Sequence, residues 1–170
     1  MCGIVGIMNA GKRPVDEEVL RAMGSTLQHR GPDDEGSFTD GPLGFFHKRL
    51  SIIDLKTGHQ PMTSDGLTVA FNGEIYNYIE LRNDLKRLGH VFRTASDTEE
   101  ILRMYAEYGL DFIGRLNGMF AFLLYDRERR IVIAARDHFG IKPLYFHTGP
   151  DHILYASEIG GRGVLAAVSS

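Results

Sequence analysis

Hydrophobic residues fall in short runs separated by turn-forming residues throughout this 170-residue chain, a pattern that predicts many short strands interrupted by helices. The first run, residues 3–9, is apolar and β-branched, and it predicts a strand that begins almost at the N-terminus. Further strands are predicted at residues 36–39, 43–47, 67–71, 118–125, 130–135, 144–147 and 153–156. Residues 48–66 carry no regular pattern, and an irregular stretch of that length is uncommon unless it is functional.

Three segments carry apolar residues at helical spacing. Asp16 is placed to cap the first, which runs to about residue 28, and Gly89 ends the second, which begins near Ile79. The third covers residues 96–108. Because most of the predicted strands follow one another through short turns, they are expected to pair antiparallel. The pattern therefore predicts an α+β fold in which antiparallel sheet is covered by helices.

The composition narrows the class of protein. Hydrophobic residues make up 43% of the chain and charged residues 24%, which is ordinary for a globular domain and excludes a disordered one. A net charge of −3 shows no basic excess, so we expect neither nucleic acid nor a membrane surface as a partner. The chain has one cysteine, no signal-like start and no apolar run of membrane-spanning length, which predicts a cytoplasmic protein.

The single cysteine, Cys2, is open to two interpretations. A free cysteine is most often a small buried apolar side chain. If Met1 is cleaved, however, Cys2 becomes the N-terminal residue, and its α-amino group lies beside its thiol. An amine with a reference pKa of about 7.7–8.0 can serve as the general base for a thiol nucleophile. The position alone does not decide between these interpretations.

The dipeptide Asn72-Gly73 follows a predicted strand and precedes Glu74. Asn-Gly is the strongest short signal for a two-residue hairpin turn, and that is the simpler interpretation. Alternatively, the asparagine amide and the glycine N–H are two neutral donors that could converge on one oxygen as an oxyanion hole. Glu74 could assist either arrangement.

Two charged residues have a structural and a functional interpretation. Arg49, in the irregular stretch, is either a surface arginine or a two-pronged donor for a carboxylate. Asp97 lies between Ser96 and Glu99, which have the spacing of a capping box, so it either supports a helix N-terminus or binds a substrate ammonium group.

Other chemistry has little support in the sequence. The seven histidines lack metal-motif spacing and there is no Cys-x-x-Cys pair, so no metal site is predicted. No P-loop or Gly-x-Gly-x-x-Gly pattern supports nucleotide binding. Residues 136–140, Arg-Asp-His-Phe-Gly, are interpreted as a salt-bridged turn.

Eight motifs, in order and at compatible spacing, resemble the class II glutamine amidotransferase domain, and most closely the N-terminal half of glutamine-dependent asparagine synthetases. They are MCGIVGI at 1–7, HRGPDDEG at 29–36, RLSIIDL at 49–55, GHQPM at 58–62, FNGEIYNY at 71–78, SDTE at 96–99, LNGMFAF at 116–122 and ARDHFGIKPLY at 135–145. The resemblance covers residues 1–159, and RLSIIDL with GHQP favours the asparagine-synthetase branch over the sugar-phosphate and purine amidotransferases.

The resemblance implies an N-terminal nucleophile hydrolase, a four-layer αββα sandwich of two antiparallel sheets between helices. It implies that the enzyme hydrolyses L-glutamine to glutamate and ammonia, with Cys2 as nucleophile and Asn72 and Gly73 as the oxyanion hole. It assigns the glutamine α-carboxylate to Arg49. The same resemblance implies that the glutamine α-ammonium group is held by Gly73, Glu74 and Asp97. It also implies that the backbone of Leu50, Ser51, Ile52 and Ile53 lines the pocket.

The chain departs from that pattern after residue 159. Residues 160–170, GGRGVLAAVSS, are interpreted as a tail, and the 170 residues contain no Ser-Gly-Gly-x-Asp-Ser pyrophosphate loop. We therefore expect that the chain cannot make asparagine alone, that ATP and magnesium belong to an absent synthetase domain, and that no cofactor binds here. A synthetase domain or subunit is expected to accept the ammonia and to cover an exposed apolar patch. The alternative is a non-catalytic assembly module or a truncated remnant.

Overall fold

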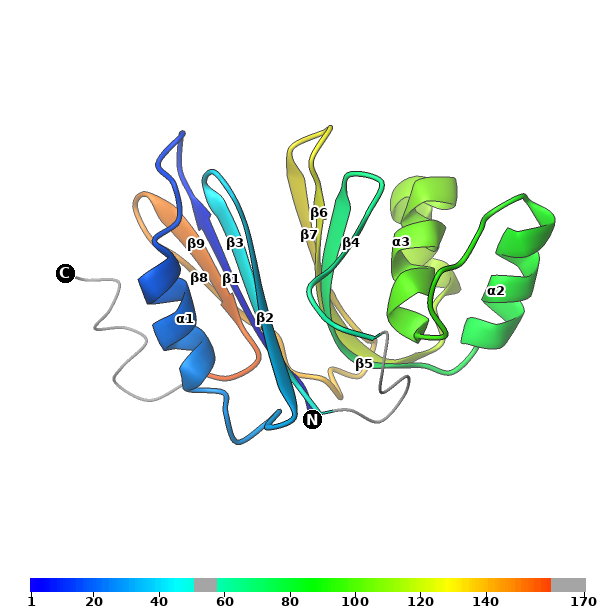
Figure 1. The fold of residues 1–170 in the computed structure, drawn as a ribbon, viewed down its shortest axis with the longest axis horizontal. Helices are drawn as coiled ribbons and strands as arrows, with labels where there is room; N and C mark the ends of the chain where they lie inside the picture. The colour runs from blue at the N-terminus through cyan, green and yellow to red at the C-terminus, as the bar shows by residue number, and fades with distance from the viewer. Residues whose placement is uncertain (51–57, 160–170) are drawn as a thin grey trace.

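The computed structural model describes residues 1–50 and 58–159, which form two antiparallel sheets packed face to face (Figure 1). The first sheet has five strands in the order β2 (Asp34–Asp40), β3 (Leu43–Arg49), β1 (Gly3–Asn9), β9 (His152–Ala156) and β8 (Tyr145–Thr148). The second sheet has four, in the order β4 (Met62–Ser64), β5 (Leu67–Ile75), β6 (Gly118–Asp126) and β7 (Ile131–Arg136). Every neighbouring pair is antiparallel, as predicted.

Helices cover the outer faces of both sheets (Figure 1). Helix α1 (Glu17–Ser25) packs on the five-stranded sheet, and α3 (Asp97–Tyr108) packs on the four-stranded sheet, with α2 (Tyr78–Arg87) against α3. A 3-10 helix, η1 (Gly109–Arg115), continues from α3. The four layers confirm the predicted αββα architecture. Within the two described ranges, no helix is long and apolar enough to cross a bilayer.

Three apolar clusters fill the spaces between the layers. The largest joins the four-stranded sheet to α2 and α3 and contains Phe71, Leu85, Ile101, Phe112 and Phe122. The second joins α1 to the five-stranded sheet. The third lies between the sheets and contains Ile4, Leu43, Phe45, Ala70, Leu123 and Tyr125. Burial of the third cluster holds the two sheets together, because the hydrophobic effect scales with the apolar area removed from water.

Strand β1 lies at the centre of its sheet, between β3 and β9. Its first residues are held from both sides: Gly3 is opposite Lys48 of β3, and the Ile4 N–H donates to Ser157 Oγ at 2.9 Å. A chain terminus usually frays, but this one is the start of a central strand. The N-terminal residues therefore have a defined place at one end of the sandwich.

The helix caps follow the sequence prediction in part. Asp16 caps α1 by accepting from the Glu18 N–H at 2.8 Å, which confirms the predicted cap. Ser96 caps α3 by accepting from the Thr98 N–H at 3.2 Å. Glu99 does not complete a capping box, because its carboxylate accepts instead from the backbone N–H groups of the preceding loop at Arg93 and Thr94.

Three further local predictions are wrong. Strand β4 lies inside the predicted irregular stretch 48–66. Strand β5 continues to Ile75, so Asn72-Gly73 is paired with β6 and is not a hairpin turn. The turn after β7 is organised by backbone N–H groups rather than by an ion pair, because the Asp137 carboxylate accepts hydrogen bonds from the chain at Phe120, Phe139, Ile141 and Lys142.

Candidate active site

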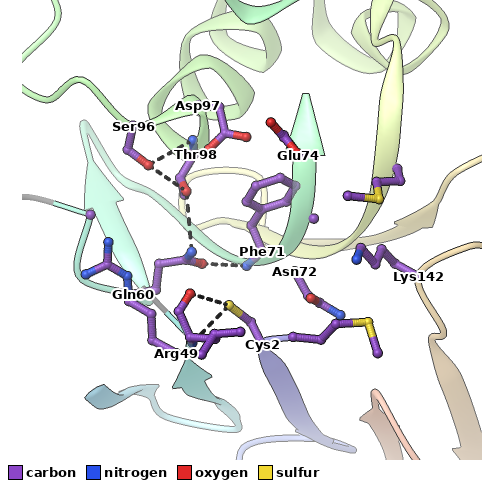
Figure 2. Close-up of a pocket in the computed structure, with 15 residues that line it drawn as sticks. Cys2, Arg49, Gln60, Phe71, Asn72, Glu74, Ser96, Asp97, Thr98 and Lys142 are labelled. Carbon is purple, nitrogen blue, oxygen red and sulfur yellow. Dashed lines mark hydrogen bonds between the residues drawn. The ribbon is translucent and has the colours of Figure 1, made fainter. Parts of the chain in front are cut away.

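A cavity of about 150 Å³ lies where the start of β1, the end of β3, the second half of β5 and the N-terminus of α3 meet (Figure 2). This volume is smaller than that of typical drug-sized sites and suits a ligand of the size of one amino acid. The residues that line the cavity are Met1, Cys2, Arg49, Leu50, Gly58, Gln60, Phe71, Asn72, Gly73, Glu74, Ser96, Asp97, Thr98, Met119 and Lys142.

The fold brings together the predicted site residues that the structure describes. Seven of them line this one cavity: Cys2, Arg49, Leu50, Asn72, Gly73, Glu74 and Asp97. The other three, Ser51, Ile52 and Ile53, lie outside the described residues. So does the predicted tail, residues 160–170, and the domain boundary at 159 stays a prediction.

The thiol of Cys2 is held by the backbone of Leu50, the residue after β3. The Leu50 N–H donates to Sγ at 3.4 Å, and the thiol reaches the Leu50 carbonyl oxygen at 3.7 Å. Burial raises the pKa of the Cys2 thiol above its ordinary value, and this effect outweighs the opposing influence of the Leu50 N–H, the N-terminal ammonium and Arg49. The thiol is therefore protonated at neutral pH and requires a base to become a nucleophile.

Arg30 fixes the backbone of Cys2. Its Nε donates to the Cys2 carbonyl oxygen at 2.9 Å, and its Nη1 is paired with Glu158, which also contacts His29. The Arg30 side chain is only 6% exposed. Sequence reasoning assigned Arg30 no role, although it lies in the motif HRGPDDEG that supported the resemblance.

Asn72 presents a hydrogen-bond donor that is not used elsewhere. The residue is 1% exposed, and among the residues that the structure describes, its Nδ2 has no partner. Leaving a buried donor unsatisfied costs about 1–3 kcal/mol, so such an atom requires an explanation. Asn72 lines the cavity beside Cys2 (Figure 2).

Gly73 lies where β5 and β6 approach closely. A Cβ at this position would lie 2.1 Å from the Met119 carbonyl oxygen and 2.7 Å from the Phe120 Cα, at a backbone φ of +156°. Only glycine fits there. The Gly73 backbone therefore borders the cavity next to Asn72.

Asp97 places a carboxylate at the opposite side of the cavity from Cys2 (Figure 2). It is 4% exposed, and its Oδ2 accepts from the Ile75 N–H at 3.0 Å. Burial raises the pKa of Asp97 to about 6, with a further contribution from the negative charge of Glu74. The negative charges of Asp97 and Glu74 repel each other, and a positively charged ligand would relieve that repulsion.

Sequence reasoning missed Gln60, Thr98 and Lys142, which also line the cavity. The Gln60 side chain joins β5 to α3: Oε1 accepts from the Phe71 N–H at 2.6 Å, and Nε2 donates to Thr98 Oγ1 at 3.3 Å. Lys142 is 8% exposed. All three lie in quoted motifs, so the motifs themselves were the available signal. Within residues 1–50 and 58–159, no cluster of three or more His, Cys, Asp or Glu residues could hold a metal ion.

Two relatives, one bacterial and one archaeal, match almost the whole chain. It is 46% identical over 165 residues to asparagine synthetase (glutamine-hydrolyzing) 1 of Bacillus subtilis, a match that covers 93% of this chain and 26% of that protein. It is 36% identical over 187 residues to the putative asparagine synthetase (glutamine-hydrolyzing) 2 of Methanocaldococcus jannaschii, covering 98% and 35%. The chain thus spans about a quarter to a third of the length of these relatives.

Solved structures share the fold at low sequence identity. The glutamine phosphoribosylpyrophosphate amidotransferase of B. subtilis, complexed with ADP and GMP, superposes with a TM-score of 0.78 at 24% identity and covers 96% of this chain and 43% of that one. The allosteric regulatory enzyme of purine biosynthesis has a TM-score of 0.74 at 22% identity, covering 99% and 43%. These superpositions show that the chain shares its fold, two antiparallel sheets between helices, with both of these proteins.

The family assignment rests on the sequence itself. Residues 1–167 match the family described as glutamine amidotransferase domain, which is nearly the full length of the chain. The cavity between the two sheets, with a cysteine at its edge and an unused amide donor beside it, lies within that matched region. The chain therefore belongs to the glutamine amidotransferase domain family.

Proposed function

We propose that this chain hydrolyses the side-chain amide of L-glutamine to glutamate and ammonia, with Cys2 as the nucleophile. The observation that carries the proposal is the unused Asn72 donor in the same cavity as the Cys2 thiol. A nucleophile and an oxyanion donor are the two elements that acyl transfer requires. Two of the relatives described above are named as glutamine-hydrolyzing, which agrees with this choice of amide.

The first half of the reaction forms a thioester. Removal of Met1 frees the α-amine of Cys2, which takes the thiol proton as sulfur attacks the amide carbon of glutamine. The resulting oxyanion accepts hydrogen bonds from Asn72 Nδ2 and the Gly73 N–H. The tetrahedral intermediate collapses as the amine returns the proton to the leaving nitrogen. Ammonia departs, and the γ-glutamyl group remains on the sulfur.

The second half restores the enzyme. Water attacks the thioester carbon and gives a proton to the same α-amine, and the oxyanion forms again in the same place. When the intermediate collapses, the sulfur leaves and takes the proton back as a thiol. Glutamate is released, so the net reaction consumes one glutamine and one water and yields one glutamate and one ammonia.

Charged groups in the cavity suit the α-amino acid end of glutamine. Arg49 has the planar two-pronged donor geometry that matches the α-carboxylate. Asp97, with Glu74 nearby, suits the α-ammonium group, whose charge would offset their mutual repulsion. We propose that Leu50, and with it Ser51, Ile52 and Ile53, forms the backbone wall of the pocket.

We further propose that the ammonia goes to a synthetase domain or subunit that acts on aspartate and that holds the ATP and magnesium that reaction needs. The named relatives are three to four times longer than the matched region, which leaves room in them for such a domain. Exposed apolar side chains on and before β8, among them Phe139 at 91% and Phe146 at 74%, offer a surface for it. A nucleophilic thiol that must stay reduced suits the cytoplasm.

The test is ammonia release from L-glutamine by purified protein whose mass shows loss of Met1. A Cys2→Ala variant, purified in the same way, is the control. We expect the wild-type chain to release ammonia and glutamate in equal amounts and the variant to release neither. Full activity in Cys2→Ala would overturn the proposal, and so would an inactive chain whose Met1 has been removed.

A further inference from the structure

Among the residues that the structure describes, no strand covers the edge of β5 next to the proposed oxyanion hole. Strand β4 pairs Met62 with Val69, and the same register continued by two residues would bring Gln60 opposite Phe71. The β4 ladder, however, begins only at Met62, and Pro61 has no N–H to donate. Phe71 is 3% exposed, so its backbone N–H and carbonyl oxygen need partners other than water.

Two side chains supply those partners. Gln60 Oε1 accepts from the Phe71 N–H at 2.6 Å, and His47 Nε2 contacts the Phe71 carbonyl oxygen at 2.9 Å. Both are buried, with Gln60 6% and His47 0% exposed. A carbonyl oxygen only accepts, so His47 carries its proton on Nε2. Burial lowers the pKa of His47 to about 4, which keeps the ring neutral at physiological pH.

The two contacts come from different parts of the sandwich. His47 belongs to β3, in the five-stranded sheet, and it reaches across to β5 in the other sheet. The far end of Gln60 donates to Thr98 Oγ1 at 3.3 Å, and that hydroxyl also contacts Ser96 Oγ at 3.0 Å (Figure 2). Phe71 is thereby tied both to the sheet that holds Cys2 and to the helix N-terminus that holds Asp97.

We propose that Gln60 and His47 are positioning residues, which hold the backbone of Phe71 from two sides and so aim the oxyanion donors of Asn72 and Gly73. The inference rests on the proposed glutamine hydrolysis and assigns a role to the GHQPM motif, which the reaction itself leaves without one. Oxyanion donors act only when they are held close to the position of the developing charge, and an error of about 1 Å can cost about 100-fold in rate.

Substitutions that keep shape but remove the hydrogen bonds test this role. Gln60→Met loses the contacts to Phe71 and Thr98, and His47→Leu loses the link between the sheets. We expect each to lower kcat for glutamine by about 10- to 100-fold while KM changes by less than about threefold. His47→Gln keeps a donor at similar reach and should recover most of the rate. If Gln60 instead bound substrate directly, KM would rise, and that result would overturn the proposal.

A matched control separates positioning from loss of stability. Tyr105→Phe removes another buried hydrogen bond, from the Tyr105 hydroxyl to Asp126 at 2.8 Å, at the end of the four-stranded sheet far from Asn72. It should lower the melting temperature about as much as Gln60→Met and leave kcat unchanged. Equal loss of kcat in both variants would mean that Gln60 acts only through stability.

Amide hydrogen exchange gives a readout that does not need activity. In Gln60→Met, the amide of Phe71 should exchange faster than in wild type, whereas amides at the far end of β5 should not change. Unchanged protection at Phe71 overturns the positioning role even if the wild-type chain releases no ammonia. Conversely, an active wild type with an unaffected Gln60→Met kcat refutes this inference and leaves the proposed hydrolysis standing.

Discussion

The carboxylate of Asp97 accepts a hydrogen bond from the backbone N–H of Ile75 at 3.0 Å. This contact joins the first residue of α3 to the last residue of β5, two positions after Gly73. It holds a buried carboxylate in place although burial raises its pKa to about 6. A carboxylate kept in an unfavourable place by the fold is typical of functional sites, where a ligand supplies the missing charge.

Glutamine binding should weaken as the pH falls. We propose that Asp97 binds the α-ammonium group, which it can do only when ionised, and its pKa in the free protein is about 6. KM for glutamine should therefore be constant at pH 7–8 and rise as the pH drops through 6. Asp97→Asn should raise KM at pH 8 by roughly 10- to 100-fold, as expected for loss of a charge-assisted hydrogen bond. Steady-state kinetics across this range measure both, and a flat wild-type KM between pH 5 and 8 would contradict the assignment.

The same substitution should stabilise the fold. The pKa of Asp97 is about 6 in the folded chain, above its ordinary value of 3.8. A carboxyl group whose folded pKa is raised supports folding below its unfolded pKa and loses that support as the pH rises through the folded value. Asp97→Asn should therefore gain about 1–3 kcal/mol at pH 8 and much less at pH 4. Urea unfolding at the two pH values checks this, and equal effects at both would be evidence against it.

Asn72→Ala should lower activity without a matching loss of stability. Removing one oxyanion donor typically costs about 100- to 1,000-fold in kcat. The Asn72 Nδ2 has no partner among the residues described, so loss of this donor breaks no hydrogen bond within that part of the chain. Measurements of ammonia release should therefore show a lower kcat, whereas thermal melting should show a nearly unchanged melting temperature. A large drop in melting temperature would show that Asn72 is structural.

Retention of Met1 should abolish glutamine hydrolysis. In that state the amine proposed as the general base is an amide nitrogen, and general base catalysis is typically worth about 100- to 10,000-fold. A variant with one extra residue between Met1 and Cys2 that resists removal should lose activity by about this factor. Mass spectrometry verifies the N-terminus, and alkylation by iodoacetamide verifies that the thiol remains accessible. Undiminished ammonia release would exclude the amine as the base.

Removal of Arg82 should destabilise the helical layer over the site. Arg82 pairs with Glu100, which is 0% exposed, and donates to the carbonyl oxygens of Thr94 at 3.0 Å and Ser96 at 3.1 Å. Breaking a buried ion pair from one side typically costs about 3–5 kcal/mol. Arg82→Met should show this loss in chemical denaturation, and adding Glu100→Gln should recover part of it. A double variant as unstable as the single one would mean that the Glu100 charge is not the cause.

Local elements followed from the sequence because their causes are local. The Asp16 cap, the hairpin of residues 118–135 and the helix that begins after Ser96 depend on residues a few positions apart. Such features need only neighbouring residues for their explanation. Cys2 and Asn72 were identified differently, through the order of the motifs along the chain.

At Asn72-Gly73 the tertiary structure overrides the local turn propensity. The dipeptide has a strong turn propensity, yet it lies within β5 because Asn72 pairs with Ala121 and Gly73 with Phe120 of β6. Helices α2, α3 and η1 separate these strands along the chain, so no local sequence pattern indicates the pairing. Strand propensity depends on the cross-strand neighbour, which only the tertiary structure provides.

The sequence by itself determined which side chains were available and what chemistry they could perform. The tertiary structure decided that they meet: β1 is held between β3 and β9, which brings Cys2 to Leu50, and two packed sheets bring His47 and Gln60 to Phe71. The physical reason is that strand order and sheet packing follow from contacts between residues far apart in sequence. These contacts contribute their free energy only when the folded core brings the distant residues together.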